Sequence, residues 1–499
     1  MDIPIIAPRR IGLMQLLVLL TLLGFVGVAV PGWLDWIAQS QAAIAFPYGL
    51  DYGEGPVLDQ ALGLARGEQI YRIPGGEPPF TLANYPPLYP LLQLPFVWLV
   101  GPALWYGRVI NLVCILLAAA AIGGTIWRTT RSVAGALVGA LLLPLFPYIV
   151  HWSAFVRVDS LALAFSCAGL WAAAGVQLIA ADDAAGRRRA RRWLVVAIVF
   201  CSAAVFSRQS AALAAPLAVG VWLLRQRWQW ALGFALAMIV VCGGAALLLN
   251  LATGGAFYYN TVVANVNPFS WGSVRNYASE IWEHMAGFVV AAAAFVLVGW
   301  WRGRPIWWLA APFLVGAIGS AITIGKTGSN VNYLFELCAA LSLACGALVA
   351  TIPPLWGRAL LVAALAAQIG PLRARTTNEY LPRVAGRIAD RVAVSELAAL
   401  VATANGPVLA DEWMALVPVG GKRLMFQPFE LKQLADADLW DDTALARRLM
   451  RAEYPLILLY DSPDWDSQGE RWTPLLRYAI SEGYAEVDRI AETRVMRPR

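Results

Sequence analysis

Apolar runs long enough to cross a bilayer recur along most of this chain, and they constrain its fold more than any other feature. The first run, RRIGLMQLLVLLTLLGFVGVAVPGW, begins with Arg9 and Arg10. A cleavable signal sequence is the alternative, but the run is long for one and contains no convincing small-residue cleavage site. Together with the later runs it predicts about eleven membrane spans. The later spans are expected at residues 106–127, 132–150, 159–180, 193–207, 211–224, 228–249, 285–301, 305–324, 333–352 and 357–371.

The composition agrees with a chain that lies mostly in lipid. Hydrophobic residues make up 59% and charged residues 14% of the 499 residues, which is more apolar surface than a soluble domain can cover. Nucleic acid is excluded as a partner, because the basic residues lie between apolar runs instead of clustering with exposed aromatic side chains. The six cysteines lie inside apolar runs without zinc-ligand spacing, and two histidines are too few for a histidine-based metal site. We therefore expect an all-α polytopic membrane protein.

Arginine placement assigns the two sides of the membrane. The basic stretches WRTTRS, GRRRARR, RQR and WRGR occur at alternate connections, as does Arg358, on the side of Arg9 and Arg10. The positive-inside rule makes this side cytoplasmic. We expect a multi-pass protein of the cell inner or plasma membrane, with a cytoplasmic N-terminus and a long first outer loop at about 32–105. The Pro-rich run NYPPLYPLLQLPFVWLVGP in that loop is expected to be re-entrant or surface-lying, since a span there would place GRRRARR outside.

The character of the sequence changes near the end of the last predicted span. Charged residues become frequent from Thr376 on, and short apolar runs such as YPLILLY alternate with helical stretches such as RVAVSELAALVAT. This alternation is typical of a small α/β domain. The chain is therefore expected to divide into a transmembrane domain at 1–371 and an extracytoplasmic α/β domain at 372–499.

The first outer loop has two carboxylates directly after the first span. In YGLDYGEGPVLDQALGLARG, Asp51 and Glu54 precede an apolar helical pattern that Pro56 can begin and Gly67 can end. The pattern predicts a short amphipathic helix on the bilayer surface. Two interpretations of the acids stay open. They cap this helix, or they carry out chemistry from a tight turn that the neighbouring glycines allow.

Four cations lie at the predicted outer ends of spans, where the positive-inside rule makes them conspicuous. They are Arg108 in WYGRVIN, Arg157 in FVRVDS, Arg208 in VFSRQS and Lys326 in IGKTGSN. Each alone could be a snorkelling side chain. Four in one layer favour a phosphate site near the headgroups, because the guanidinium fork binds phosphate oxygens in pairs. Asp159 is expected to pair with Arg157, or to position an acceptor or a metal ion.

The order of several short motifs resembles the GT-C superfamily of integral-membrane glycosyltransferases. The motifs are DYGEG, LARGEQIY, NYPPLYP, GRVIN, RVDSLALAF, FSRQSAALAAP, YYNTVVANVNPFSW and GSNVNYLFE. The chain is most similar to a bacterial branch of Rgt-like members, related to the lipid A aminoarabinose transferases and protein O-mannosyltransferases. The resemblance extends over about residues 9–370, and its specificity rests on the order of the whole set.

The resemblance implies a polyprenyl-phosphate sugar as donor, a first-loop carboxylate as base and basic residues that hold the lipid phosphate. Asp51 and Glu54 match the acidic motif of the family, which commonly has two adjacent acids, whereas Gly53 precedes Glu54 here. Both acids stay candidates for the base, and the distance from Glu54 to LARG fits the family spacing better. By position, Arg108 and Arg208 match basic residues of the family and Asp159 matches an acidic one. Together with Arg157 and Lys326 from the layer of cations, Arg108 and Arg208 are the expected donor-phosphate residues, with Asp159, Tyr85, Asn330 and Asn332 in supporting positions.

We expect a glycosyltransferase that moves a sugar, with inversion, from this donor to an extracytoplasmic glycan, lipid or protein, while membrane lipids surround its spans. One alternative is a transporter or flippase of lipid-linked saccharides, for which internal repeats are expected and none is visible. Another is a membrane-anchored protein whose outer domain captures glycan or protein. The sequence requires no cofactor, although Asp51, Glu54 and Asp159 offer oxygen ligands for a divalent metal ion.

Overall fold

The computed structural model describes residues 12–177, 183–265 and 267–499. Arg9 and Arg10, and the end of the span predicted at 159–180, lie outside the described residues. In the described part, eight helical segments are long and apolar enough to cross a membrane. Six of these segments contain α1 (Leu13–Ala45), α4 (Trp105–Thr130), α8 (Ala184–Ser207), α13 (Trp271–Trp301), α14 (Trp307–Ile322) and α15 (Phe335–Thr351).

Two of the eight segments are continuous rods that include a π-helical turn. One joins α10 (Trp228–Met238) to α11 (Gly244–Ala252), and the other joins α16 (Leu355–Arg375) to α17 (Leu381–Ala389). Three further predicted spans fall on shorter helices, which are α5 (Val133–Leu142), α7 (Asp159–Ala173) and α9 (Ala214–Gln226). The structure thus confirms a multi-span helical protein, while the count of eleven spans stays a prediction.

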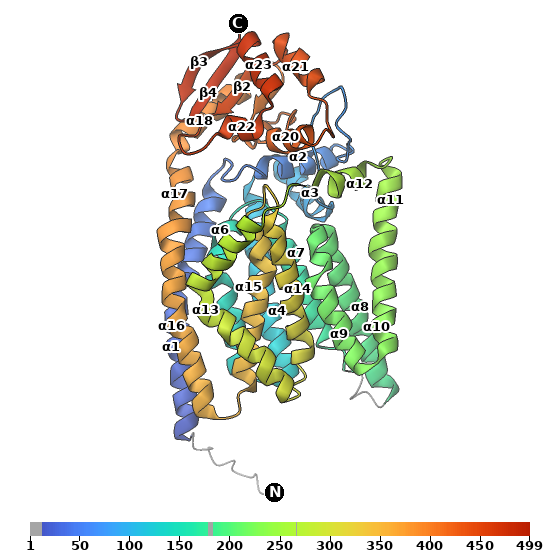
Figure 1. Ribbon diagram of the computed structural model, residues 1–499, viewed down its shortest axis with the longest axis vertical. Coiled ribbons are helices and arrows are strands. Elements are labelled where there is room, and N and C mark those ends of the chain that lie inside the picture. Colours follow the sequence, from blue (N-terminus) through green and yellow to red (C-terminus); the bar gives the residue numbers. More distant parts are fainter. Residues whose placement is uncertain (1–11, 178–182, 266) are drawn as a thin grey trace.

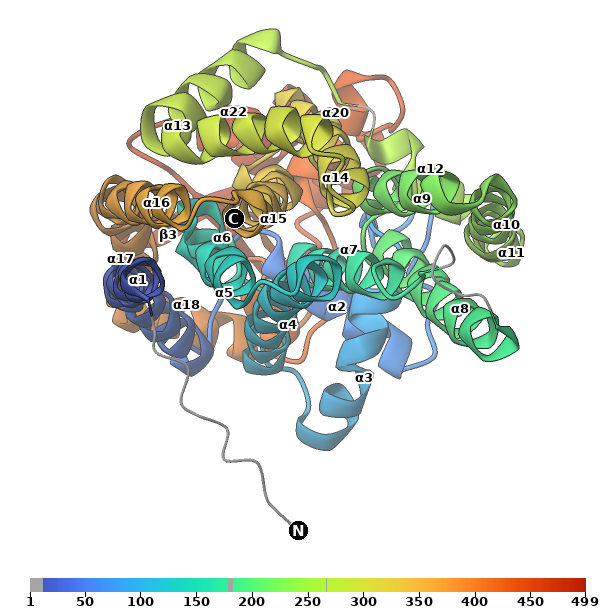
Figure 2. The same cartoon turned by 90° about the horizontal axis from the view of Figure 1, so that it is seen from below.

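The bundle has a protein-enclosed centre and lipid-facing edges. In the most apolar stretch of the segment that contains α15, 89% of the residues are buried inside the protein. In that of the α10–α11 rod, 6% of the residues are buried. Figure 2 shows α15 inside the ring of helices and α10–α11 at its edge. Close packing at the centre depends on small residues, since Gly135 of α5 and Gly346 of α15 face each other and a side chain on either would overlap the other's backbone.

The first loop folds into two short helices on top of the bundle. These are α2 (Glu54–Ala65) and α3 (Leu88–Val100). The apolar face predicted for α2 is present, with Leu58 and Ala61 fully buried. This face packs on protein, against α3 and the C-terminal part of the chain, rather than on the bilayer surface. In α3, which lies in the run expected to be re-entrant or surface-lying, Trp98 and Leu99 are exposed.

The C-terminal part of the chain forms a four-stranded sheet with helices around it, as the α/β pattern predicted. The strand order is β1-β2-β4-β3, with β1 parallel to β2 and the other pairs antiparallel. The strands are β1 (Val408–Ala410), β2 (Leu456–Tyr460), β3 (Tyr484–Ile490) and β4 (Thr493–Pro498). The helices are α18 (Arg391–Thr403), α19 (Leu416–Val419), α20 (Pro428–Asp436), α21 (Thr443–Met450), α22 (Ser467–Arg471) and α23 (Pro474–Gly483).

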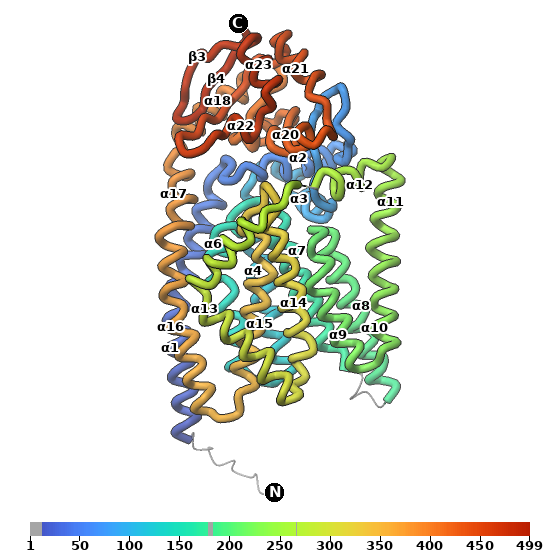
Figure 3. Tube along the Cα trace, in the orientation of Figure 1, coloured from blue at the N-terminus to red at the C-terminus, as the bar shows by residue number. Residues whose placement is uncertain are grey.

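This C-terminal region sits at one end of the bundle, directly over the first loop (Figure 1). The α16–α17 rod carries the chain there, and the trace in Figure 3 shows it rising along α1 past the ends of the other helices. The expected domain boundary after residue 371 therefore falls inside a continuous helical rod. Two further short helices, α6 (Pro147–Trp152) and α12 (Ala256–Thr261), lie at the same end of the bundle.

Candidate functional site

Glu54 and Arg108 form a fully buried ion pair at the base of the first loop. Arg108 Nε donates to Glu54 Oε1 at 3.0 Å, and its Nη2 donates to Oε2 at 2.8 Å. Glu54 is 0% exposed and Arg108 is 1% exposed. This paired geometry is the strongest form of an arginine–carboxylate contact.

The same pair ties three segments of backbone together. Glu54 accepts the backbone N–H groups of Leu50 and Val156, each at 2.7 Å. The Arg108 guanidinium donates to three carbonyl groups at the end of α1 and the start of the loop, those of Ala43, Phe46 and Tyr48. Both oxygens of Glu54 are therefore occupied by donors, and the pair fixes the path of the loop between α1 and α2.

Asp51 forms a second, less buried pair with Arg157, which precedes α7. Arg157 Nε lies 3.1 Å from Asp51 Oδ2, and the two side chains are 21% and 15% exposed. The backbone N–H of Gly53 also donates to Oδ2, at 2.9 Å. A Cβ atom at Gly53 would overlap the Arg157 guanidinium, so glycine is needed for this close approach. Burial raises the pKa of Asp51, against the opposing effect of Arg157.

Asp159 and Arg208 form the third pair, at the N-terminus of α7 and just after α8. Arg208 Nη1 lies 2.8 Å from Asp159 Oδ1. Arg157 was expected to pair with Asp159, but it pairs with Asp51. The turn before α7 directs the Arg157 side chain towards the first loop. Asp159 also accepts from Trp152 Nε1 at 3.1 Å and from the amide of Asn332 at 3.0 Å.

The remaining predicted residues are Tyr85, Lys326, Asn330 and Asn332, of which Asn332 donates its side-chain amide to Asp159 of the third pair. Burial, together with the charges of Tyr333 and Asp159, raises the pKa of the Tyr85 phenol. Lys326 is half-buried, its Nζ lies 3.4 Å from the Asn265 carbonyl oxygen, and it has no ion pair within the described ranges. Asn330 is exposed, and its side-chain oxygen accepts the backbone N–H of Val331.

The three carboxylates do not converge on a common metal position. Each is engaged by its own arginine, and no group of three or more His, Cys, Asp or Glu side chains within 12–177, 183–265 and 267–499 has the spacing of a metal site. A cation placed among them would have to displace the guanidinium groups. The residues present therefore do not fit a divalent ion held by Asp51, Glu54 and Asp159 together.

An apolar groove of about 740 Å³ opens between α3, α4, α7 and α8. Its lining is almost wholly apolar. On α7 it includes Leu161 and Phe165, which lie roughly 3 and 9 Å below Asp159 at 1.5 Å per residue. The groove therefore begins within one helical turn of the layer that contains the three ion pairs. The lining also includes Leu92 and Phe96 of α3, Val109, Ile110, Val113, Cys114 and Leu117 of α4, and Phe200 of α8.

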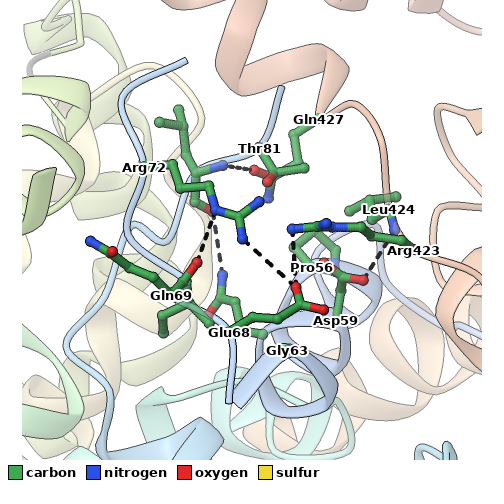
Figure 4. Close-up of a pocket in the computed structure, with 13 residues that line it drawn as sticks. Pro56, Asp59, Gly63, Glu68, Gln69, Arg72, Thr81, Arg423, Leu424 and Gln427 are labelled. Atoms are coloured by element: carbon green, nitrogen blue, oxygen red, sulfur yellow. Dashed lines mark hydrogen bonds and ion pairs between the residues drawn. The ribbon is translucent and has the colours of Figure 1, made fainter. Parts of the chain in front are cut away.

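A separate, polar pocket lies on the other side of α2, where the first loop meets the C-terminal region (Figure 4). Arg423 Nη2 forms an ion pair with Glu68 Oε2 at 3.0 Å in this pocket. Asp59 Oδ1 accepts the backbone N–H of Leu424 at 3.0 Å. None of the predicted site residues is part of its lining. We interpret the pocket as an interface that docks the C-terminal region on the first loop.

Several side chains at the site were missed from the sequence. Trp152 and Tyr333 bracket the third pair, since the ring centre of Tyr333 lies 4.3 Å from the Arg208 guanidinium carbon. The sequence signal that could have found them is proximity to predicted residues, since Trp152 lies just before FVRVDS and Tyr333 follows Asn332. Glu430 reaches the first loop from the C-terminal region, and no sequence spacing connects a residue so distant with Asp51.

Comparison with solved structures relates this arrangement to known proteins. The chain superposes with a TM-score of 0.61 on ArnT from Cupriavidus metallidurans bound to undecaprenyl phosphate, at 16% identity, with 95% of this chain and 97% of that chain covered. The chain has the GT-C fold. The archaeal oligosaccharyltransferase AglB from Archaeoglobus fulgidus, in complex with an inhibitory peptide and a dolichol-phosphate, shares this fold at a TM-score of 0.52 and 11% identity, with 86% of this chain and 69% of that chain covered.

The similarity lies in the fold and not in the sequence. Neither a family model nor a curated protein sequence matches the chain. Both solved GT-C structures were obtained with a polyprenyl-type phosphate bound. In this chain, the GT-C fold brings an apolar groove and a layer of arginines and carboxylates to the same end of the bundle.

Proposed function

We propose that this protein is a glycosyltransferase that takes a sugar from a polyprenyl-phosphate donor and transfers it to an acceptor outside the cytoplasm. The observation that carries the proposal is the apolar groove that ends within one helical turn of Asp159 and Arg208. A groove of this kind suits a hydrocarbon chain, and the polar layer above it suits the phosphate and sugar that such a chain carries. The undecaprenyl phosphate bound to ArnT and the dolichol-phosphate bound to AglB support a ligand with a hydrocarbon chain and a phosphate.

In this proposal the donor phosphate lies beside Lys326, Arg208 and Arg157. Lys326 has a positive charge without an ion-pair partner in the described chain, so it is the first ligand for an incoming anion. Arg208 and Arg157 are shared with carboxylates and retain N–H donors for phosphate oxygens. Arg108 is enclosed by Glu54 and three backbone carbonyl groups, and we assign it the role of holding the loop.

The proposed general base is Asp51 rather than Glu54. Glu54 has no exposed surface, and donors occupy both of its oxygens, so an acceptor hydroxyl cannot reach it. Asp51 is partly exposed, and the ion pair with Arg157 and the hydrogen bond from Gly53 are both made through Oδ2 of its side chain. Its raised pKa also favours proton uptake, because a base works best when its pKa approaches the working pH.

The proposed step is one displacement at the anomeric carbon. The acceptor oxygen forms the new glycosidic bond as its proton passes to an Asp51 oxygen. The bond between the anomeric carbon and the phosphate oxygen breaks with its electron pair going to the polyprenyl phosphate. Lys326 and Arg208 stabilise the added negative charge on that leaving phosphate. Because attack and departure occur on opposite faces of the sugar, the anomeric configuration inverts.

We also propose that the site faces outward and that residues 372–499 lie outside the cytoplasm. The exposed arginines at the start of α8 lie at the end of the bundle opposite the C-terminal region (Figure 1). The positive-inside rule then makes that end cytoplasmic in an inner or plasma membrane. A reporter fused after Arg499 that is active only outside the cytoplasm is expected to be active. A fusion active only in the cytoplasm would reverse the orientation.

The function is tested with purified protein in lipid nanodiscs. Undecaprenyl phosphate-linked hexoses and pentoses are supplied with a cell-envelope glycolipid fraction as acceptor pool, and release of undecaprenyl phosphate is measured. We expect release by the wild type and at least a 100-fold slower rate in Asp51→Asn. Asp461→Asn, which changes an exposed aspartate of the C-terminal region, is the matched control and is expected to react at the wild-type rate. Equal rates in wild type and Asp51→Asn would remove Asp51 as the base, and no release with any donor would refute the function.

A further inference from the structure

We propose that Tyr52 and Glu430 are positioning residues through which the C-terminal region holds Asp51 in place. This inference rests on the proposed function and adds to it a specific role for the C-terminal region. Tyr52 directly follows Asp51 in the sequence. Glu430, its hydrogen-bond partner, lies far along the chain in the first turn of α20.

The hydroxyl of Tyr52 acts both as a hydrogen-bond donor and as an acceptor, and both of its partners are in the C-terminal region. Its hydroxyl donates to Glu430 Oε2 at 2.6 Å and accepts the backbone N–H of Phe429 at 3.0 Å. The ring of Phe429 meets the Tyr52 ring edge-on, with 6.4 Å between centroids. Burial next to Glu430 raises the pKa of Tyr52, so the phenol stays protonated and keeps donating. The side chain next to Asp51 therefore has one orientation only.

Arg471 closes the other side of the Tyr52 ring. Its guanidinium carbon lies 4.9 Å from the ring centroid, and its Nη2 is bonded to Glu412. Glu412 is also bonded to Arg387, so the cation above Tyr52 is itself held in place by other residues of the C-terminal region. Such a stacked cation contributes binding energy and restricts the tilt of the ring.

The backbone around Asp51 is shaped to receive this contact. A Cβ atom at Gly49 would collide with the side chain of Ala415, and one at Gly55 would collide with the backbone of Met414 and Ala415. The glycines on either side of Asp51 thus allow the C-terminal region to touch the loop itself. With Arg157 on one side and the Tyr52–Glu430 contact on the other, Asp51 lies between two anchors that belong to different parts of the chain.

Glu430 also affects the charge of the site. It is half-buried, and Arg157, the partner of Asp51, is among the charges that favour its ionised form. The charged groups that face Asp51 are Arg157, Glu54 of α2 and Glu412 of the C-terminal region. Asp51 and Glu430 are both close to Arg157, so Glu430→Gln removes a negative charge from the neighbourhood of Asp51, and the loss of a like charge lowers the pKa of a carboxyl group. A contact that only stabilised the fold would not produce this shift.

The test compares Tyr52→Phe, Glu430→Gln and the double variant in the donor-release assay. We expect Tyr52→Phe to lower kcat by about 10- to 100-fold, as a small displacement of a catalytic group does, with the donor KM within twofold of wild type. Glu430→Gln keeps an acceptor for the Tyr52 hydroxyl and is expected to lose less, while the acid limb of its kcat–pH profile moves to lower pH. The double variant is expected to be no slower than Tyr52→Phe alone.

The control is Tyr460→Phe, which removes the hydroxyl of another tyrosine–glutamate contact, that with Glu492 in the same region. It is expected to leave kcat unchanged. Wild-type kcat in Tyr52→Phe, with Asp51→Asn inactive, would overturn this inference and leave the proposed function intact. A second measurement needs no reaction. Backbone amides of residues 48–54 are expected to exchange hydrogen faster in Tyr52→Phe than in Tyr460→Phe, and equal exchange would overturn the inference even if no donor is ever found.

Discussion

The substitution Glu54→Gln tests the proposal that Glu54 holds the first loop while Asp51 takes the proton. The substitution keeps the shape of the side chain and removes its charge, so Arg108 stays buried with no carboxylate beside it. The glutamine oxygen can still accept one backbone N–H. Its NH2 group then lies against donors that Glu54 had accepted, among them the Arg108 guanidinium. We therefore expect the loop between α1 and α2 to lose its fixed path.

The magnitude follows from the burial of the pair. Breaking a buried ion pair on one side typically costs about 3 to 5 kcal/mol, since the remaining charge keeps its desolvation penalty. With Glu54 at 0% and Arg108 at 1% exposure, we expect Glu54→Gln to lose about 3 kcal/mol of stability. Arg108→Gln is expected to lose more, because three carbonyl groups then lose their donor as well as Glu54 its cation. Asp51→Asn, in a partly exposed pair, is expected to unfold near the wild-type temperature.

The assay is thermal unfolding in nanodiscs, followed by donor release from the folded fraction of each variant. We expect Glu54→Gln to melt well below wild type and to regain part of its rate when a bound donor stabilises the fold. Asp51→Asn is expected to melt normally and to be inactive. The opposite outcome would refute the reasoning. If Glu54→Gln melted at the wild-type temperature without activity, while Asp51→Asn turned over normally, Glu54 would be the base.

Three further outcomes test the donor site and the base. Lys326→Gln is expected to raise the donor KM by about tenfold without changing the melting temperature, because a charge-assisted contact of about 1.5 kcal/mol is lost; an unchanged KM would remove Lys326 from the site. Val113→Trp fills the groove from its lipid-exposed wall and is expected to raise KM for undecaprenyl donors more than for short-chain donors in parallel titrations. Because the pKa of Asp51 is raised, kcat is expected to fall with acidification at a pH above that of an ordinary aspartate, and the acid limb is expected to disappear in Asp51→Asn.

The sequence predicted features that depend on local pattern. The spans followed from runs of apolar residues, and α2 ends at Ala65, close to the Gly67 that was expected to end it. Its first residue is Glu54, so the helix begins two residues before Pro56. The apolar face of α2 was also predicted, but its partner was not. A pattern shows that a face must be buried, and it does not show whether lipid or protein covers it.

The pairing of charges could not be predicted in the same way. Asp159 was expected to pair with Arg157 because the two are close in sequence, yet Arg208 is its partner. Residues two apart at the start of a helix point in different directions, and the path of the loop decides which cation each acid meets. The contact of Tyr52 with Glu430 is further out of reach, since it exists only after the C-terminal region has docked.

The exposure of the three ion pairs explains how one layer of similar groups can have different roles. A buried pair has already lost its water, so approach of a substrate would have to break contacts that nothing replaces. Glu54 and Arg108 are in this position. The side chains of Asp159 and Arg208 are 2% and 9% exposed, so this pair is less enclosed, and Arg208 retains N–H donors for a phosphate oxygen while it stays paired with Asp159. Asp51 and Arg157 keep enough exposed surface to exchange their contacts for those of a substrate. We therefore propose that the chemistry takes place at Asp51 and Arg157, the least buried of the three pairs, and the proposed contact of Tyr52 with Glu430 then holds the residue next to Asp51 in place.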